Sequence, residues 1–213
     1  MKKLLSYLWP FTKEVKSQVN GTLELTWING KKVLDSQNAN YSYGSLQKLL
    51  CFGLSKIEIH NNDQILLLGL GGGSIIRSLR EKFIFNGKIT AVEIDELIIK
   101  LAKTEFNITN SNTLEIICED AFAYIHQSKG QFEIIIVDIF IDTQVPEQFY
   151  SLQFWNQLMK RLSPSGYILF NAGINLTDQN KIKHLILAFE TKIGFTEYQK
   201  VEGANTILVG RKL

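Results

Sequence analysis

The sequence predicts an α/β fold: a Rossmann-like three-layer sandwich with a mainly parallel seven-stranded sheet that ends in an antiparallel hairpin. Short apolar runs alternate with helix-length amphipathic segments, a glycine-rich turn follows the first run, and the last two strands lie too close for a crossover helix. The 213 residues, 45% of them hydrophobic, suffice for one such core. We expect residues 1–45 to form a small N-terminal β-hairpin region and residues 46–213 the Rossmann-like domain.

The N-terminal hairpin is predicted from an alternating segment and a turn. Apolar and polar residues alternate over residues 21–28, and Asn29-Gly30 follows, a pair that accepts the positive φ angles of a tight two-residue turn. Residues 31–34 can return as the second strand. Apolar residues then recur at helical spacing over residues 43–54, which predicts a helix joining the hairpin to the main domain.

Five apolar runs in the main domain have the length and branching of strands that are covered on both faces. Because amphipathic segments separate them, right-handed crossovers and a parallel sheet are expected. The short connection between the two closing strands requires an antiparallel pair. The predicted parallel strands lie at residues 65–68, 89–92, 114–117, 134–137 and 167–170, the helices at 74–85, 95–106, 120–127, 147–162 and 178–192, and the closing strands at 195–199 and 206–209.

Composition argues against several classes of function. The 23 Lys and Arg exceed the 21 Asp and Glu by too little to create a surface field that attracts nucleic acid. No apolar run reaches the ~20 residues of a membrane span, so we expect a cytoplasmic protein. The two cysteines, Cys51 and Cys118, lie far apart in apolar runs, which predicts buried, reduced thiols, and we assign no metal ligand.

A glycine-rich turn, Gly69-Leu70-Gly71-Gly72-Gly73-Ser74, separates the first parallel strand from its helix. Glycines allow a tight turn, let the backbone approach a ligand, and direct a helix amino terminus toward it. Alone this is weak evidence, because nucleotides, flavins and S-adenosylmethionine all use such turns. Glu93 closes the second strand about 20 residues later, where an acid can bind ribose hydroxyls. The alternative for Glu93 is a helix cap, the role that we favour for Asp95.

Two more acids end the third and fourth strands. Asp120 can accept a hydrogen bond from an adenine amino group or cap the following helix, and we favour the adenine. Because the carboxyl ends of parallel strands face one crevice, we expect Asp138 beside the reacting end of a bound cofactor. A carboxylate there can orient an incoming amine or hydroxyl. The alternative for Asp138 is a hydrogen bond within its own loop.

With these residues the chain resembles the spermidine synthase superfamily, a branch of the S-adenosylmethionine-dependent methyltransferase fold with an N-terminal strand region. The resemblance runs from about residue 21 to the C-terminus and is most specific at residues 69–74, 92–95, 119–121 and 136–138. It implies that S-adenosylmethionine, or its decarboxylated form, binds to these loops. The cofactor-binding residues that it implies are Gly69, Gly71, Gly72, Gly73, Glu93, Ile94, Asp120 and Ala121.

The chain departs from the aminopropyltransferases of that superfamily at residues that bind the polyamine. Their glycine turn has Asp at the position of Gly72, their Tyr-His-Glu triplet corresponds to residues 43–45, and their second loop acid appears one place late, at Asp142. An ammonium in an enclosed pocket needs carboxylates to replace its hydration, so these losses count against polyamine binding.

Around the reaction centre we predict Asp138 and Tyr43 as catalytic residues, with substrate contacts from Gln37, Tyr41 and Asp142. For the two tyrosines, packing of the hairpin onto the sheet is an equal alternative.

These residues favour an S-adenosylmethionine-dependent methyltransferase acting on an unknown small acceptor, because transfer from a sulfonium needs little beyond positioning. The first alternative is an aminopropyltransferase of polyamine biosynthesis that uses decarboxylated S-adenosylmethionine. The second is a non-catalytic nucleoside-binding module, and the third is a nicotinamide-dependent dehydrogenase, disfavoured by Ser74 and the closing hairpin. We expect a small-molecule substrate as partner, with no nucleic acid and no membrane, and leave a homodimer open.

Overall fold

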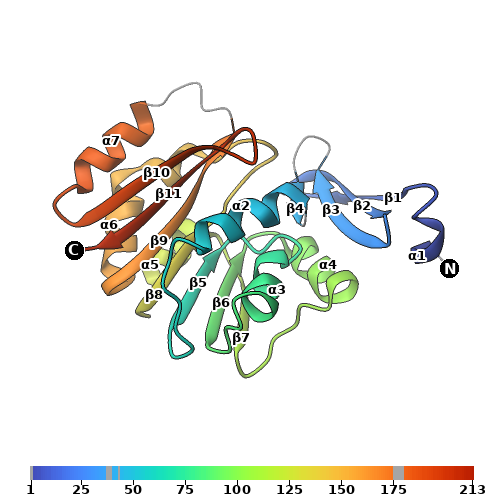
Figure 1. Cartoon of the computed structure of the whole chain (residues 1–213), viewed down its shortest axis with the longest axis horizontal. Helices are drawn as coiled ribbons and strands as arrows, with labels where there is room; N and C mark the ends of the chain where they lie inside the picture. Colours follow the sequence, from blue (N-terminus) through green and yellow to red (C-terminus); the bar gives the residue numbers. More distant parts are fainter. Residues whose placement is uncertain (1, 37–39, 43, 175–179) are drawn as a thin grey trace.

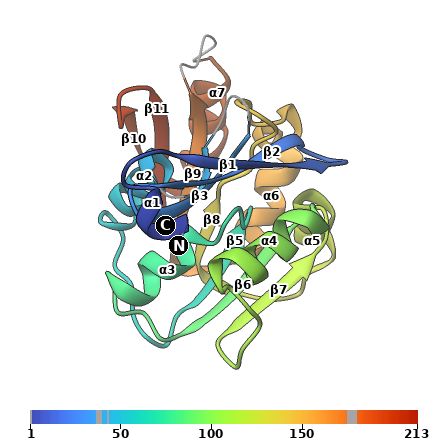
Figure 2. The ribbon, with the colours of Figure 1, turned by 90° about the vertical axis from the view of Figure 1, so that its right-hand side faces the viewer.

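The computed structural model describes residues 2–36, 40–42, 44–174 and 180–213. It contains a four-stranded antiparallel sheet near the N-terminus and a seven-stranded sheet that makes up the main body (Figure 1). Figure 1 shows the small sheet to one side of the large one, and Figure 2, which views the molecule from that side, shows the small sheet in front. Helix α2 (Gly44–Leu54) joins the two sheets, as its periodicity predicts.

The small sheet extends the predicted hairpin by a strand on each side. After the short helix α1 (Lys2–Leu5) it runs in the order β1 (Phe11–Ser17), β2 (Gly21–Ile28), β3 (Lys31–Ser36) and β4 (Asn40–Ser42). The predicted turn is confirmed, with φ angles of 49° at Asn29 and 73° at Gly30. Strand β1 was not predicted, because most of its residues are polar and exposed and it forms by backbone pairing with β2.

The large sheet confirms the predicted mixed topology. Its strand order is β10-β11-β9-β8-β5-β6-β7. The five strands β5 to β9 pair in parallel, whereas β11 pairs antiparallel with both β9 and β10. The strands are β5 (Gln64–Leu68), β6 (Lys88–Glu93), β7 (Leu114–Cys118), β8 (Phe132–Val137), β9 (Leu162–Ile174), β10 (Ile193–Val201) and β11 (Asn205–Lys212).

Helices cover both faces of this sheet and complete the three layers. One core cluster draws on α2, α3 (Ser74–Glu81) and α4 (Glu96–Phe106), and the other on α5 (Ala121–Gln127), α6 (Leu152–Arg161) and α7 (Asn180–Phe189). The helix predicted at 147–162 is divided into η1 (Glu147–Tyr150) and α6, because the Ser151 side chain accepts a hydrogen bond from Phe154 N and caps α6. Within the described segments, no helix is both long and apolar enough to cross a membrane.

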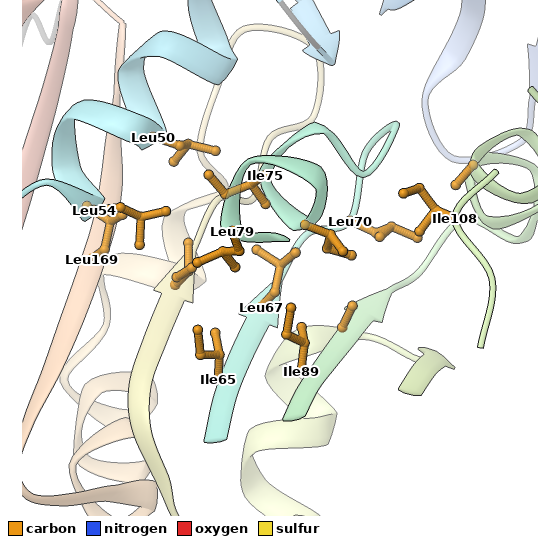
Figure 3. Packing of buried hydrophobic residues seen from close by; sticks show 14 of the residues in the cluster. Leu50, Leu54, Ile65, Leu67, Leu70, Ile75, Leu79, Ile89, Ile108 and Leu169 are labelled. Atoms are coloured by element: carbon orange, nitrogen blue, oxygen red, sulfur yellow. The ribbon is translucent and has the colours of Figure 1, made fainter. Parts of the chain in front are cut away.

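Strand β5 lies at the centre of the core. Ile65 and Leu67 pack into one cluster, while Leu66 and Leu68 pack into the cluster on the opposite face, and all four are fully buried. Figure 3 shows Leu67 between the neighbouring strands and the helices above them. The continuous apolar run therefore reflects cover on both faces, as predicted.

The edge strand β7 is an exception. The prediction that it is covered on both faces, and that both thiols are buried, is wrong: Cys118 is exposed and Cys51 is half-buried. Strand β7 pairs with only one neighbour, β6, so the end of its apolar run reaches the surface.

We expect Leu67→Ala to lower the free energy of unfolding by about 2–5 kcal/mol, because it leaves a cavity in a fully buried layer. Leu187→Ala, at a side chain that is 62% exposed on α7, is the control and should change it by less than about 0.5 kcal/mol. Urea unfolding followed by circular dichroism measures both. Equal losses would contradict this assignment of the core.

Candidate active site

The loops that follow β5, β6, β7 and β8 converge on one pocket of about 220 Å³ at the carboxyl edge of the sheet. This convergence follows from parallel strands, whose carboxyl ends share one edge. The wall combines polar groups from three strand ends with apolar residues from the loop after β8. Of the residues predicted to bind the cofactor or react with it, Gly69, Gly71, Glu93, Ile94, Asp120, Ala121 and Asp138 line the pocket.

The glycine turn between β5 and α3 forms part of the pocket wall. Gly69 has φ 95°, and a Cβ there would lie 2.0 Å from the carbonyl oxygen of Asp138, so no other residue fits. Gly71 also has positive φ and lines the pocket. Gly72 and Gly73 are buried and do not line the pocket. Gly73 instead permits close packing, because a Cβ there would lie 2.5 Å from Cγ1 of Ile108.

Glu93 connects the end of β6 to the glycine turn. Its Oε2 accepts hydrogen bonds from the N–H groups of Leu70 (3.1 Å) and Gly71 (3.4 Å), and its Oε1 accepts one from Asp95 N (3.1 Å). Burial raises the pKa of Glu93 above its usual value, and the three N–H donors oppose that rise. Its carboxylate is therefore held rigidly at the pocket wall, where its remaining lone pairs can accept hydroxyl donors.

Asp95 is a helix cap, as predicted, and it also anchors the small sheet. Its Oδ1 accepts from Leu97 N (2.9 Å) at the start of α4, while its Oδ2 accepts from Ser17 Oγ (2.5 Å) and Asn20 Nδ2 (2.7 Å). These bonds bring the β1–β2 turn to the pocket, where Val19 and Asn20 form part of the wall. The sequence prediction missed this wall, since only the tertiary contact with Asp95 places it there.

Asp120 combines both roles that the sequence allowed. Its Oδ1 accepts a hydrogen bond from Ala123 N (2.8 Å) and caps α5, yet the residue also lines the pocket. The helix cap, which the sequence offered as the alternative to adenine, is therefore present. Contact with adenine through the other oxygen stays a prediction.

Asp138 lies at the end of β8, half-buried, and its Oδ1 accepts a hydrogen bond from Nδ2 of Asn171 on β9 (2.9 Å). Burial raises the pKa of Asp138 to about 6, the Asn171 hydrogen bond opposes that rise, and nearby Glu93 adds to it. Its side chain thus bonds to a neighbouring strand, which the sequence did not predict. At pH 7 the carboxylate is mainly ionised and can accept a proton.

The other predicted catalytic residue, Tyr43, and the predicted substrate residues are placed less completely. Gln37 and Tyr43 lie outside the described residues, and Tyr41 lies in β4, where only the backbone is described. Asp142 does not line the pocket; its Oδ1 accepts a hydrogen bond from Ser36 Oγ (3.0 Å), which ties the loop after β8 to the small sheet. That loop and the short helix η1 after it supply apolar wall residues that the prediction passed over: Ile139, Phe140, Ile141 and Pro146 from the loop and Phe149 from η1. The sequence signal that could have identified this wall was the run of apolar residues directly after the end of β8.

The pocket is acidic. Its ionisable lining residues among those described are Glu93, Asp120 and Asp138, with no Lys, Arg or His. Nor does any part of the described chain bring together three His, Cys, Asp or Glu residues that could hold a metal ion. Such a pocket suits an organic cation that can hydrogen-bond to carboxylates.

We expect Glu93→Gln to weaken binding of methylthioadenosine by at least about tenfold, because an amide cannot accept from all three backbone N–H groups and still serve ribose hydroxyls. Glu96→Gln, at an exposed residue in the first turn of α4, is the control and should leave the affinity within twofold. Isothermal calorimetry measures both. Equal affinities of the two variants would show that Glu93 is not part of the binding site.

Comparison with solved structures shows the same fold in proteins of two kinds. A probable spermidine synthase from Corynebacterium glutamicum matches 95% of this chain and 77% of its own, with a TM-score of 0.68 and 18% identity. Human methyltransferase-like protein 13, solved in complex with SAH, matches 80% of this chain and 83% of its own, with a TM-score of 0.65 and 20% identity. At these identities the comparison shows the fold alone.

Comparison of sequences is more specific. Polyamine aminopropyltransferase 2 of Aquifex aeolicus is 30% identical over 148 residues, which cover 65% of this chain and 29% of the relative. A second relative, from Bifidobacterium longum, is matched over only 28% of its length, so this chain spans less than a third of the length of these two relatives. The family model of the spermine/spermidine synthase domain matches residues 47–197. The chain therefore belongs to the spermine/spermidine synthase family.

Proposed function

We propose that this chain transfers an aminopropyl group from decarboxylated S-adenosylmethionine to an amine. The observation that carries this proposal is the charge of the pocket, which has three acids and no basic side chain among its described lining residues. The decarboxylated donor is a dication, with a sulfonium and an ammonium group, whereas S-adenosylmethionine also carries a carboxylate that these acids repel.

The relatives support the same proposal. The two curated relatives described above are named as a polyamine aminopropyltransferase and a probable polyamine aminopropyl transferase, which is the alternative that the sequence prediction placed behind methyl transfer. We therefore reverse that order. The expected cytoplasmic location, the small-molecule partner and the homodimer stay predictions.

In the proposed complex each strand end contacts a different part of the donor. Glu93 accepts hydrogen bonds from the ribose hydroxyls, and Asp120 accepts one from the adenine amino group. Ile94 and Ala121 flank the base, while Gly69 and Gly71 allow the donor chain to lie against the backbone. The sulfonium then faces Asp138 at the end of β8.

The proposed reaction is a direct displacement. The lone pair of the amine nitrogen forms a bond to the aminopropyl carbon next to sulfur, and the C–S bond breaks with its electron pair remaining on sulfur. The sulfonium becomes the neutral thioether of methylthioadenosine, and Asp138 accepts the proton that the nitrogen loses. Because the donor is already activated, holding the two reactants in line supplies most of the acceleration.

Methyl transfer is the second candidate, and Gly72 favours it. The aminopropyltransferases that the chain resembles have Asp at this position, so a carboxylate for the donor ammonium is missing from the turn. The donor that binds more tightly distinguishes the two candidates.

We expect decarboxylated S-adenosylmethionine to bind at least about tenfold more tightly than S-adenosylmethionine, because only the latter brings an anion into an acidic pocket. Isothermal calorimetry at two salt concentrations measures both affinities, and the difference should shrink at high salt. Tighter binding of S-adenosylmethionine, with release of S-adenosylhomocysteine on addition of an acceptor, would favour methyl transfer instead.

We expect Asp138→Asn to lower kcat at least about 100-fold while the Kd of the donor changes less than threefold, because the proton acceptor is lost and the shape is kept. In the unsubstituted protein kcat should rise as the pH increases through about 6, the pKa of Asp138. Asp63→Asn is the matched control: Asp63 is also buried, but it bonds to His60 N before β5, at the opposite edge of the sheet.

The folding of the Asp138→Asn variant provides a further check on this interpretation. A raised pKa in the folded state means that ionisation of Asp138 opposes folding, so the unsubstituted protein should lose stability relative to the variant as the pH rises from 4 through 6. A kcat that does not depend on Asp138 would remove it from the reaction, and the absence of turnover in the unsubstituted protein would favour a non-catalytic nucleoside-binding module.

A further inference from the structure

A second hollow adjoins the donor pocket between α2 and the ends of β9 and β11. Leu46 and Phe140 line both spaces, and Asp138, which lines the first, is hydrogen-bonded to Asn171, which lines the second. The rest of its described wall comes from Ser45 and Leu49 on α2 and from residues at the ends of the two strands: Asn171, Ile174 and Asn205. A molecule in this hollow lies next to the end of β8, where the proposed transfer takes place.

Asn171 is the polar group between the hollow and Asp138. It is 1% exposed, and its Nδ2 donates to Asp138 Oδ1 at 2.9 Å. This orientation is required because an ionised carboxylate only accepts hydrogen bonds. The amide oxygen Oδ1 is buried and has no hydrogen-bond partner among the described residues. A buried acceptor without a donor is unfavourable, so a ligand that brings an N–H to it is stabilised.

The chemistry of the wall limits what that ligand can be. Its described polar side chains are one hydroxyl and two amides, and its other residues are apolar. No acid, and no other ionisable residue, lies among the described residues that line it. The second ammonium of a diamine would lose its hydration there without gaining a carboxylate, whereas an uncharged alkyl tail would fit against Leu46, Leu49 and Ile174.

We propose that this hollow is the acceptor subsite, that its acceptor is a primary amine with an uncharged apolar tail rather than a polyamine, and that Asn171 determines this specificity. The inference rests on the proposed function and specifies its acceptor. One N–H of the amine donates to Asn171 Oδ1 and another to Asp138. These two contacts direct the nitrogen lone pair toward the aminopropyl carbon bound to sulfur. Asp138 receives the proton when the new N–C bond has formed and the C–S bond has broken.

The test compares n-butylamine with 1,4-diaminobutane, which have the same carbon chain and differ by one terminal amino group. Each is incubated with the protein and decarboxylated S-adenosylmethionine, and methylthioadenosine is measured by chromatography. We expect kcat/KM for n-butylamine to be at least about tenfold higher. Equal or faster turnover of 1,4-diaminobutane would overturn the inference and leave the proposed aminopropyl transfer intact.

A substitution in the wall of the hollow, with a control outside it, tests whether this wall determines the preference for n-butylamine. Asn171→Leu should lower kcat/KM for n-butylamine at least about tenfold, leave the Kd of methylthioadenosine within twofold, and move the pH midpoint of kcat upward because Asp138 loses its donor. The matched control is Asn156→Leu, at an exposed residue of α6, which should change none of these. An Asn171→Leu protein with unchanged kcat/KM and pH midpoint would contradict the assignment.

Asn205→Asp is a second variant that tests the inference even if Asn171→Leu does not fold. This change of nearly equal size places a carboxylate in the hollow, and it should raise the ratio of kcat/KM for 1,4-diaminobutane over n-butylamine at least about tenfold. An unchanged ratio would show that the wall does not contact the acceptor's distal end.

A binding measurement separates failure of the inference from failure of the proposed function. If no amine releases methylthioadenosine, aminopropyl transfer is wrong. Calorimetric titration of n-butylamine into the protein saturated with methylthioadenosine then decides the inference alone. Saturable binding that is lost in Asn171→Leu supports the subsite, and the absence of binding overturns it.

Discussion

The close approach of two backbones, at Gly69 and Asp138, is the constraint on which the rest of the site depends. A Cβ at Gly69 would lie 2.0 Å from the Asp138 carbonyl oxygen, so only glycine allows the ends of β5 and β8 to meet there. Asp138 N donates to Leu68 O, and Gly69 N donates to Val92 O, which joins three strand ends at one point. Glu93 can therefore reach the glycine turn from one side while Asp138 stands on the other.

The small sheet and the acidic strand ends act together. Asp95 accepts hydrogen bonds from Ser17 and Asn20, and Asp142 accepts one from Ser36, so the small sheet is held to the main domain on two sides of the pocket. This cover helps to desolvate the pocket, and desolvation raises the pKa values of Glu93 and Asp138. A bound cation favours their ionised forms and relieves that cost, which couples the charge of the ligand to the stability of the site.

Much of the fold was predictable because its signals are local. The apolar runs identified the five parallel strands of the large sheet, the short connection identified the antiparallel closing pair, and Asn29-Gly30 identified the hairpin turn. Glu93 and Asp138 were found because acids at the carboxyl ends of parallel strands must share one edge. The polar strand β1 carries no such signal, since backbone pairing forms it.

The parts of the site that the sequence did not predict arise from contacts between distant residues. Asn20 reaches the pocket through Asp95, 75 positions away, and Asn171 bonds to Asp138 across 33 positions. Neither pair produces a periodic pattern. The exposure of Cys118 likewise depends on β7 being an edge strand, which strand order decides and apolar composition does not.

A crystal structure with methylthioadenosine bound tests most directly whether these strand ends form one donor site. We predict that both ribose hydroxyls donate to Glu93, that the adenine lies beside Asp120, and that the thioether sulfur faces Asp138 with open space toward Asn171. A nucleoside bound elsewhere, or one whose sulfur faces away from Asp138, would contradict the account.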